Sequence, residues 1–202
     1  MATIFCTATS LDGYIADDRE SSSWLFTTEA DAPESAPESA PESAPESAPE
    51  LPRLHFSRFF AGVGAIVCGY NTFDWVRREL TASGDPFVWP HEQPTWVVTH
   101  RDPDPTPGVT FTSSPIADLH SELVNAADGK DVWIVGGGDL AGQFADLGLL
   151  DQVWIHQCPV TLGAGRPLLP RRLRLHRRDV ETDGQFTAML FDVVGPEPRT
   201  DS

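Results

Sequence analysis

The sequence predicts a three-layer α-β-α fold, with helices on both faces of a mostly parallel central sheet and an antiparallel hairpin at its C-terminal edge. Two observations predict it. Short apolar segments rich in β-branched and aromatic residues alternate with amphipathic segments at helical spacing between residues 3 and 158. Beyond them, two alternating polar-apolar segments flank Asp183-Gly184, a pair typical of a hairpin turn. We expect a single domain over residues 1–195.

The expected elements follow from the spacing of apolar residues. The buried strands are short, and Gly, Asn or Pro follows several of them. The expected parallel strands are 3–9, 65–68, 95–99, 109–112, 132–135 and 153–158, and the hairpin strands are 171–181 and 185–194. The expected helices are 51–60, 72–80, 115–127 and one that begins near Leu140.

A low-complexity segment at residues 32–50 interrupts the domain with copies of Ala-Pro-Glu-Ser. Proline at every fourth position forbids a regular helix, and the side chains offer little apolar surface to bury. We expect a solvated surface loop there, since the fold tolerates such insertions at low cost. Residues 196–202 are expected to form a flexible tail.

Composition excludes several classes of function. The net charge of −16 argues against a nucleic-acid partner, which needs a basic surface. No stretch resembles a signal peptide or a membrane span, so we expect a cytoplasmic protein with no membrane partner. Cys6, Cys68 and Cys158 lie in apolar runs and are expected to be buried free thiols. Because no metal-ligand spacing occurs, no metal site is expected.

The stretch from Val132 to Leu140 is the most informative motif. A buried strand ends at Gly136-Gly137-Gly138, and an amphipathic helix begins directly after. Residues without Cβ let the backbone approach a ligand closely, and the N–H groups at a helix start favour phosphate. The spacing differs from the dinucleotide fingerprint G-x-G-x-x-G. Alone, the turn is more typical of a tight connection than of a site.

Similar chemistry follows other strands of the predicted sheet. Ligands of such sheets bind outside the carboxyl ends of the strands. Hydroxyls, glycine N–H groups and a cation occupy most of these positions, which predicts a site for a phosphate-bearing ligand. The segments are Ser10 to Ala16, Gly69 to Thr72, Thr99 to Arg101, Gly136 to Asp139 and Pro159 to Gly165.

Taken in order, these motifs resemble the dihydrofolate-reductase-like superfamily. The chain is most similar to the reductase domain of the riboflavin-biosynthesis deaminase/reductases and their stand-alone relatives. The resemblance covers roughly residues 2–194 without the insert, and no zinc-deaminase ligand set accompanies it. It rests on Ser10-Leu11-Asp12-Gly13, Cys68-Gly69-x-x-Thr72, Trp133-x-Val135-Gly136-Gly137-Gly138 and Pro159-x-x-Leu162-Gly163-x-Gly165-x-Pro167-Leu168.

The resemblance implies an NADPH-dependent reductase that transfers hydride to a small pyrimidine- or pterin-like molecule. It also implies a homodimer paired through the C-terminal hairpin. Tyr70 stands where the family usually has an arginine for the 2′-phosphate, and His100 or Arg101 would replace that arginine. The implied cofactor-binding residues are Ile15, Ala16, Gly69, Asn71, Thr72, Thr99, His100, Arg101, Val135, Gly136, Gly137, Gly138, Asp139 and Leu140.

On the substrate side, the candidates are Asp12, Trp24 and Arg166. Asp12 is the expected catalytic and substrate-binding carboxylate, although an Asp before Gly also commonly caps its own turn. Trp24 is placed near the substrate pocket or in the core, and Arg166 is the candidate for a substrate phosphate. His156 is expected in the core or at an interface.

Two alternatives accompany the general reductase hypothesis. One is the specific reduction of 5-amino-6-(5-phosphoribosylamino)uracil in riboflavin biosynthesis. The other is a nucleotide-binding module without turnover, which is favoured by the tyrosine at position 70 and by the lack of a clear helix pattern around Glu29 and Asp31, the carboxylates that follow Trp24.

Overall fold

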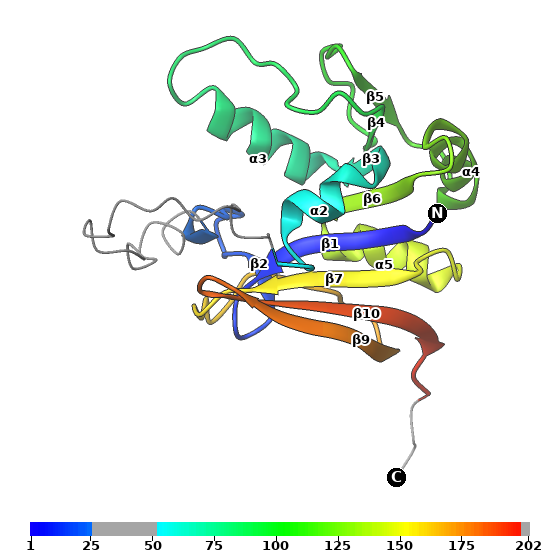
Figure 1. Cartoon of the computed structure of the whole chain (residues 1–202). Coiled ribbons are helices and arrows are strands. Elements are labelled where there is room, and N and C mark those ends of the chain that lie inside the picture. The colour runs from blue at the N-terminus through cyan, green and yellow to red at the C-terminus, as the bar shows by residue number, and fades with distance from the viewer. Residues whose placement is uncertain (26–51, 199–202) are drawn as a thin grey trace, which may run out of the picture.

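An eight-stranded sheet forms the middle of the molecule in the computed structural model, which describes residues 1–25 and 52–198 (Figure 1). Its strands are β1 (Thr3–Thr9), β3 (Val63–Gly69), β4 (Thr95–Val98), β5 (Val109–Thr112), β6 (Asp131–Gly136), β7 (Gln152–Gln157), β9 (Leu173–Asp183) and β10 (Phe186–Pro196). Their spatial order is β5-β4-β3-β6-β1-β7-β10-β9. The pairs from β5 to β7 are parallel, and β10 pairs antiparallel with both β7 and β9. The predicted fold class is therefore confirmed.

Helices cover both faces of this sheet. The helices are α2 (Phe56–Ala61), α3 (Tyr70–Leu80), α4 (Ile116–Ala126) and α5 (Gly138–Asp146). The alternating side chains of the strands show which helices cover which face. On β1, Phe5 packs in one cluster with residues of α4 and α5. Ile4 and Cys6 point to the other face and pack with Phe59 of α2. The side chain of Phe73 on α3 packs with Cys68 and Val97. The sheet thus forms the middle of three layers.

The core fixes the ends of the parallel strands. On β6, Val132 and Ile134 are fully buried on the face covered by α4 and α5, and Trp133 points to the other face. Each fully buried aliphatic side chain of this kind stabilises the fold by about 1.5–3 kcal/mol. Strands held in this way present the residues that follow them at constant positions.

Two short segments pair without having been predicted. β2 (Tyr14–Ala16) and β8 (Arg166–Pro167) form a two-stranded antiparallel sheet. Neither is long enough to show an alternating pattern, and they lie far apart in sequence. The pairing brings the loop after β1 against the loop after β7.

The helix boundaries differ from expectation in places. α2 begins at Phe56 rather than at residue 51, because the side chain of His55 accepts a hydrogen bond from Ser57 N–H and caps the helix there. Pro52 accepts a backbone hydrogen bond from His55 N–H in a turn that precedes the helix. Residue 51 and the insert at 32–50 lie outside the described residues.

The C-terminal boundary also moves. Pro196 still pairs with Leu173, and Glu197 N–H donates to Arg172 C=O at 2.9 Å. The pairing therefore extends past residue 196, where the flexible tail was expected to start, and residues 199–202 are outside the description. The three cysteines are buried free thiols, as predicted.

No helix in residues 1–25 and 52–198 has the length and apolarity needed to cross a bilayer. Within the same residues, no three His, Cys, Asp or Glu side chains gather closely enough to hold a metal ion.

Candidate functional site

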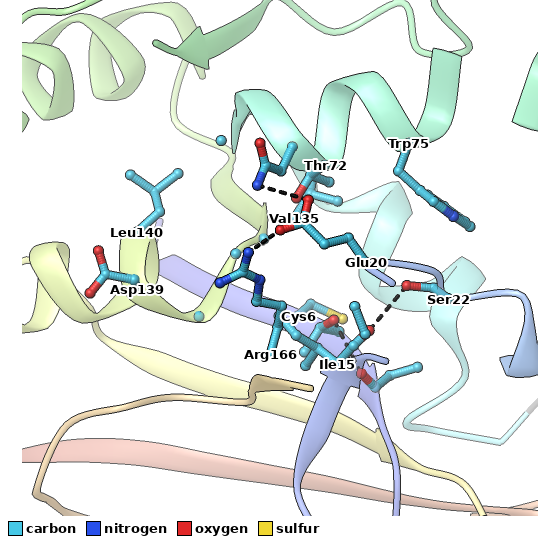
Figure 2. A pocket seen from close by; sticks show the side chains of 18 of the residues that line it. Cys6, Ile15, Glu20, Ser22, Thr72, Trp75, Val135, Asp139, Leu140 and Arg166 are labelled. Carbon is cyan, nitrogen blue, oxygen red and sulfur yellow. Dashed lines mark hydrogen bonds and ion pairs between the residues drawn. The ribbon is translucent and has the colours of Figure 1, made fainter. Parts of the chain in front are cut away.

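A cavity of about 1160 Å³ lies along the carboxyl edge of the parallel strands (Figure 2). It extends from the end of β4, past β3, β6 and β1, to β7 and the start of β10. Trp24 and Arg166, two of the predicted substrate residues, line it. So does every predicted cofactor residue: Ile15, Ala16, Gly69, Asn71, Thr72, Thr99, His100, Arg101, Val135, Gly136, Gly137, Gly138, Asp139 and Leu140.

Two helices begin at this cavity without a side-chain cap. Gly69 is the N-cap residue of α3 and Gly137 that of α5, and among the described residues no side chain bonds to the first turn of either helix as a cap. The turns adjoin, since a Cβ built on Gly136 would lie 3.2 Å from Thr72 Oγ1. The free N–H groups and positive dipole ends of both helices therefore converge on one volume, an arrangement that favours an anion.

The three glycines of the β6–α5 turn have different neighbours. A Cβ on Gly138 would lie 2.2 Å from Leu168 C=O oxygen, so only glycine fits between this helix and the segment after β8. A Cβ on Gly137 would meet nothing within 4 Å. The requirement at Gly138 is thus for packing, whereas Gly137 leaves open space on the cavity side.

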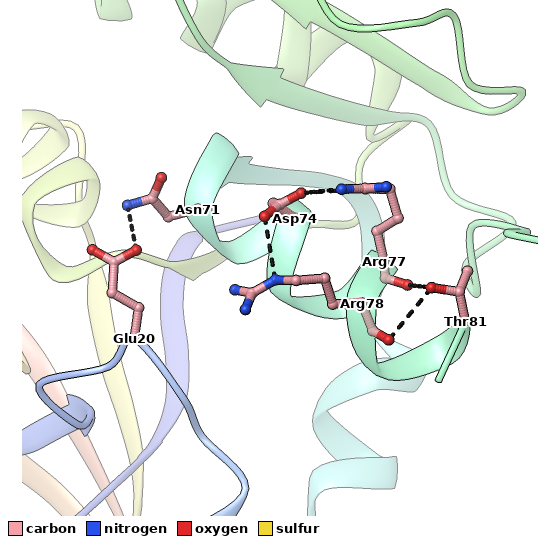
Figure 3. Close-up of polar contacts among 6 residues, drawn as sticks. All are labelled: Glu20, Asn71, Asp74, Arg77, Arg78 and Thr81. Carbon is pink, nitrogen blue, oxygen red and sulfur yellow. Dashed lines mark hydrogen bonds and ion pairs between the residues drawn. The ribbon is translucent and has the colours of Figure 1, made fainter. Parts of the chain in front are cut away.

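Glu20 carries a carboxylate into the cavity (Figures 2 and 3). Asn71 Nδ2, at the start of α3, donates to Glu20 Oε2 at 3.2 Å, and Arg166 forms an ion pair with Glu20 Oε1. Glu20 has φ of +62°, an uncommon conformation for a residue with a side chain. The carboxylate of Glu20 therefore lies beside the start of α3, where Asn71 donates a hydrogen bond to it and Arg166 forms an ion pair with it.

Arg101 takes a specific position at the β4 end of the cavity. Its guanidinium carbon lies 4.4 Å from the centroid of the Tyr70 ring, a cation–π contact. Its backbone N–H donates to Thr99 Oγ1 at 2.9 Å, which fixes the turn after β4. Tyr70 itself carries no positive charge, but its ring holds the guanidinium of Arg101 beside position 70.

Asp12 lies outside the cavity lining, which corrects the position expected from the sequence. Its carboxylate accepts hydrogen bonds from Ser10 Oγ at 2.6 Å, Gly163 N–H at 2.7 Å and Leu162 N–H at 3.1 Å. The bond from Ser10 and those from the two N–H groups lower the pKa of Asp12. The geometry gives Asp12 the turn-capping role: it ties the loop after β1 to the loop after β7.

Three further residues of the lining, Asp139, Trp24 and Ile15, have defined surroundings. The Asp139 carboxylate is 67% exposed and pairs with Arg171 at 3.1 Å, so it points toward this arginine and solvent. Trp24 is 9% exposed and lines the cavity, so it lies both in the core and at the pocket wall. The backbone of Ile15 is held by a hydrogen bond from Ser22 Oγ at 3.0 Å.

The end of the cavity at β7 and β10 was missed as a site. It is lined by Cys6, Phe56, Trp133, His156, Asp183 and Phe186. Burial is the first cause that lowers the pKa of His156, and it raises the pKa of the Cys6 thiol well above its usual range. His156, expected in the core or at an interface, is half-buried and faces the cavity. Alternation along β1 and β6 places Cys6 and Trp133 on one face, and this pattern in the sequence could have indicated that both residues line the same part of the cavity.

Comparison with known proteins identifies the family. Residues 2–188 match the model of the RibD C-terminal domain, and the chain belongs to that family. Two curated relatives come from Bacillus subtilis and are uncharacterised. YwjB is 27% identical over 94% of this chain and 96% of its own length, and YyaP is 28% identical over 71% and 79%.

Solved structures share the fold. A putative riboflavin biosynthesis protein from Shewanella sp. PV-4 is 26% identical, with a TM-score of 0.67 over 96% of this chain and 99% of that one. A deaminase/5-amino-6-(5-phosphoribosylamino)uracil reductase from Thermotoga maritima is 18% identical, with a TM-score of 0.58 over 95% of this chain and 56% of that one. The second likeness concerns the fold alone. The family and the Shewanella structure together support a reductase-like role.

Proposed function

We propose that this protein is an NADPH-dependent reductase that transfers hydride to a small heterocyclic molecule. The observation that carries the proposal is the pair of uncapped helix starts at Gly69 and Gly137, which adjoin on one cavity beside the carboxylate of Glu20. A pyrophosphate needs N–H groups and cations in this arrangement. Asn71 and Arg166, which already hold an anionic group, fit that requirement.

The position of Arg101 supports NADPH rather than NADH. The cavity extends from the helix starts toward β4, where Arg101 is held over Tyr70. A planar guanidinium fixed in this way suits the 2′-phosphate, because it offers paired donors and a permanent charge. Arg101 would thereby take the role of the arginine that the family usually has at position 70.

The remaining part of the cavity would hold the nicotinamide ring and the acceptor. NADPH supplies a hydride from its nicotinamide ring, and a proton from solvent completes the two-electron reduction of a C=N or C=O bond in the acceptor, leaving NADP⁺. The protein's own contribution is orientation: Ile15 and Ala16 would support the ring, while Trp24 and Trp133 would exclude water. No side chain of the chain needs to donate that proton.

The reduction of 5-amino-6-(5-phosphoribosylamino)uracil is the second candidate. It is the activity in the name of the Thermotoga relative, and Arg166, the predicted ligand for a substrate phosphate, lines the cavity. Arg166 is also the proposed donor to the cofactor's pyrophosphate, however, so a substrate phosphate would have to share this one cation.

Ligand-dependent stability followed by a turnover assay tests the proposal. NADPH at 100 times its Kd should raise the melting temperature by roughly 5–10 °C, and NADH at the same concentration should raise it less. NADPH oxidation is then measured with pyrimidines, pterins, flavins and quinones as acceptors. Binding with no oxidation in the whole panel would favour a nucleotide-binding module, and no binding of either dinucleotide would reject both readings.

A further inference from the structure

The end of the cavity farthest from Arg101 has a largely aromatic and apolar wall. Phe56, Trp133 and Phe186 line it together with Cys6 and Ala8 of β1. Trp133 is 5% exposed, and its ring makes edge contacts with Phe56 and Phe59, so its orientation is fixed. Aromatic side chains held in this way favour stacked or edge contacts with another aromatic ring.

The polar groups at this end offer no free positive charge. Asp183 Oδ2 lies 3.9 Å from His55 Nε2, so any charge on that imidazole is offset by this carboxylate. His156 has no hydrogen-bond partner for Nε2 among the described residues, and burial lowers its pKa, which favours the neutral ring. A neutral imidazole and a carboxylate recognise donors and uncharged polar groups rather than a phosphate.

The arginines of the cavity are engaged elsewhere. In the described part of the lining the arginines are Arg101, at the β4 end, and Arg166, paired with Glu20, and no lysine lines it. Residues 26–51, which the structure does not describe, contain no Lys, Arg or His, so they have no cation to add. That segment instead carries Glu29, Asp31, Glu34, Glu38, Glu42, Glu46 and Glu50.

We propose that the hydride acceptor is a planar, uncharged heteroaromatic molecule that carries no phosphate. The inference rests on the proposed function, because it takes the helix starts and Arg101 as the cofactor's part of the cavity. A phosphate dianion at the far end would face Asp183 without a cation to replace its hydration, which is unfavourable. The aromatic wall and the neutral His156 suit a ring with carbonyl and N–H groups.

Matched acceptors with and without phosphate test this directly. NADPH oxidation is measured with riboflavin against flavin mononucleotide, and with 5-amino-6-(ribosylamino)uracil against its 5′-phosphate. We expect the phosphate-free member of at least one pair to be reduced with a kcat/KM at least about tenfold higher. Equal or preferred use of a phosphorylated member would overturn the proposal, and so would the absence of turnover with both phosphate-free members.

Binding separates this proposal from the one on which it rests. A titration with NADPH alone reports the cofactor site, whichever acceptor is used. NADPH binding with no reduction of a phosphate-free acceptor would reject the acceptor class only. A protein that does not bind NADPH would reject the proposed function itself.

A charge substitution adds a readout that loss of structure would not imitate. Asp183→Asn should improve kcat/KM for flavin mononucleotide relative to riboflavin by roughly three- to fivefold, because it removes the repulsive carboxylate. Asp179→Asn is the matched control: Asp179 lies on the same strand, pairs with Arg53 at 2.9 Å and is not part of the lining. An unchanged ratio in Asp183→Asn, or an equal change in Asp179→Asn, would contradict the placement of the acceptor.

Discussion

The guanidinium of Arg101 stacks on the ring of Tyr70, 4.4 Å from its centroid, at the end of the cavity bounded by β4. Tyr70 is the first residue of α3, directly after β3, and Arg101 lies in the loop after the neighbouring strand β4. The tyrosine holds the positive charge in place, since an exposed arginine otherwise samples many rotamers. Cofactor selectivity in this chain is therefore expected to depend on a contact between the start of α3 and the loop after β4.

Arg101→Ala should remove the preference for NADPH. We expect NADPH affinity to fall by about 10- to 100-fold, the typical effect of losing a charge-assisted hydrogen bond, with little change for NADH. Titration calorimetry with both dinucleotides measures this. Arg78→Ala is the control, because Arg78 is an exposed arginine on α3 that pairs with Asp74 at 3.3 Å outside the cavity (Figure 3). Wild-type affinity for NADH equal to that for NADPH would contradict the assignment.

Adjacent glycines of the β6–α5 turn should respond differently to the same substitution. Gly137→Ala adds a methyl group to open space, so the melting temperature without ligand should change little while NADPH binding weakens at least about tenfold. Gly138→Ala brings a methyl group to 2.2 Å from Leu168 C=O oxygen, so it should destabilise the fold itself. Thermal denaturation with and without NADPH separates the two effects. Normal cofactor affinity in Gly137→Ala would mean that the phosphates bind elsewhere.

Glu20 should compete with the cofactor for the helix starts. Glu20→Gln removes the negative charge beside Asn71 and Arg166, and we expect NADPH affinity to rise by roughly three- to fivefold. Glu122→Gln is the matched control, since its carboxylate accepts from Trp96 Nε1 at 3.3 Å and is not in the lining. Titration of both variants with NADPH measures whether only Glu20→Gln raises the affinity. Weaker binding in Glu20→Gln would show that Glu20 contacts the cofactor instead of competing with it.

Asp12 should affect stability in a pH-dependent way and leave the chemical step alone. Hydrogen bonds, first from Ser10, lower its pKa in the folded state, so they stabilise the fold above the unfolded-state pKa. This stabilisation is lost as the pH falls through the lowered pKa. The melting temperature of Asp12→Asn should therefore lie below that of the wild type at pH 7 and approach it in acid, while the exposed Asp102→Asn follows the wild type throughout.

Turnover by the same variant tests the alternative role of Asp12. A kcat within about threefold of the wild type is expected, because the carboxylate does not line the cavity. A loss of several orders of magnitude in kcat with unchanged stability would restore Asp12 as a catalytic residue.

Local patterns predicted the parallel strands and the glycine turns and helix starts that line the cavity. The apolar run that ends at Gly136 and the helix that follows were evident because both periodicities are local. The convergence of Gly69, Thr99 and Gly136 followed from a rule of topology, since the carboxyl ends of parallel strands meet at one edge. What the sequence left open was which way each side chain points, and Asp12 was misplaced for that reason.

Contacts between distant segments could not be predicted. Glu20 bonds to Asn71 and Arg166 across separations of 51 and 146 residues, and its own neighbourhood in sequence shows no motif. β2 and β8 are short, and each is a strand because it pairs with the other. The wall made by Phe56, Trp133 and Phe186 likewise assembles only when β6, β10 and α2 are in place.

A crystal structure of the protein with bound NADP⁺ tests the central claim most directly. The pyrophosphate should lie between the turn at Gly69–Thr72 and the turn at Gly136–Gly138, with the 2′-phosphate on Arg101 and the Glu20 carboxylate displaced from Asn71. The nicotinamide ring should then lie beside Ile15 and Ala16, facing the aromatic end of the cavity. Phosphates bound away from both helix starts, or Arg101 still on Tyr70 with no contact to the cofactor, would contradict the account.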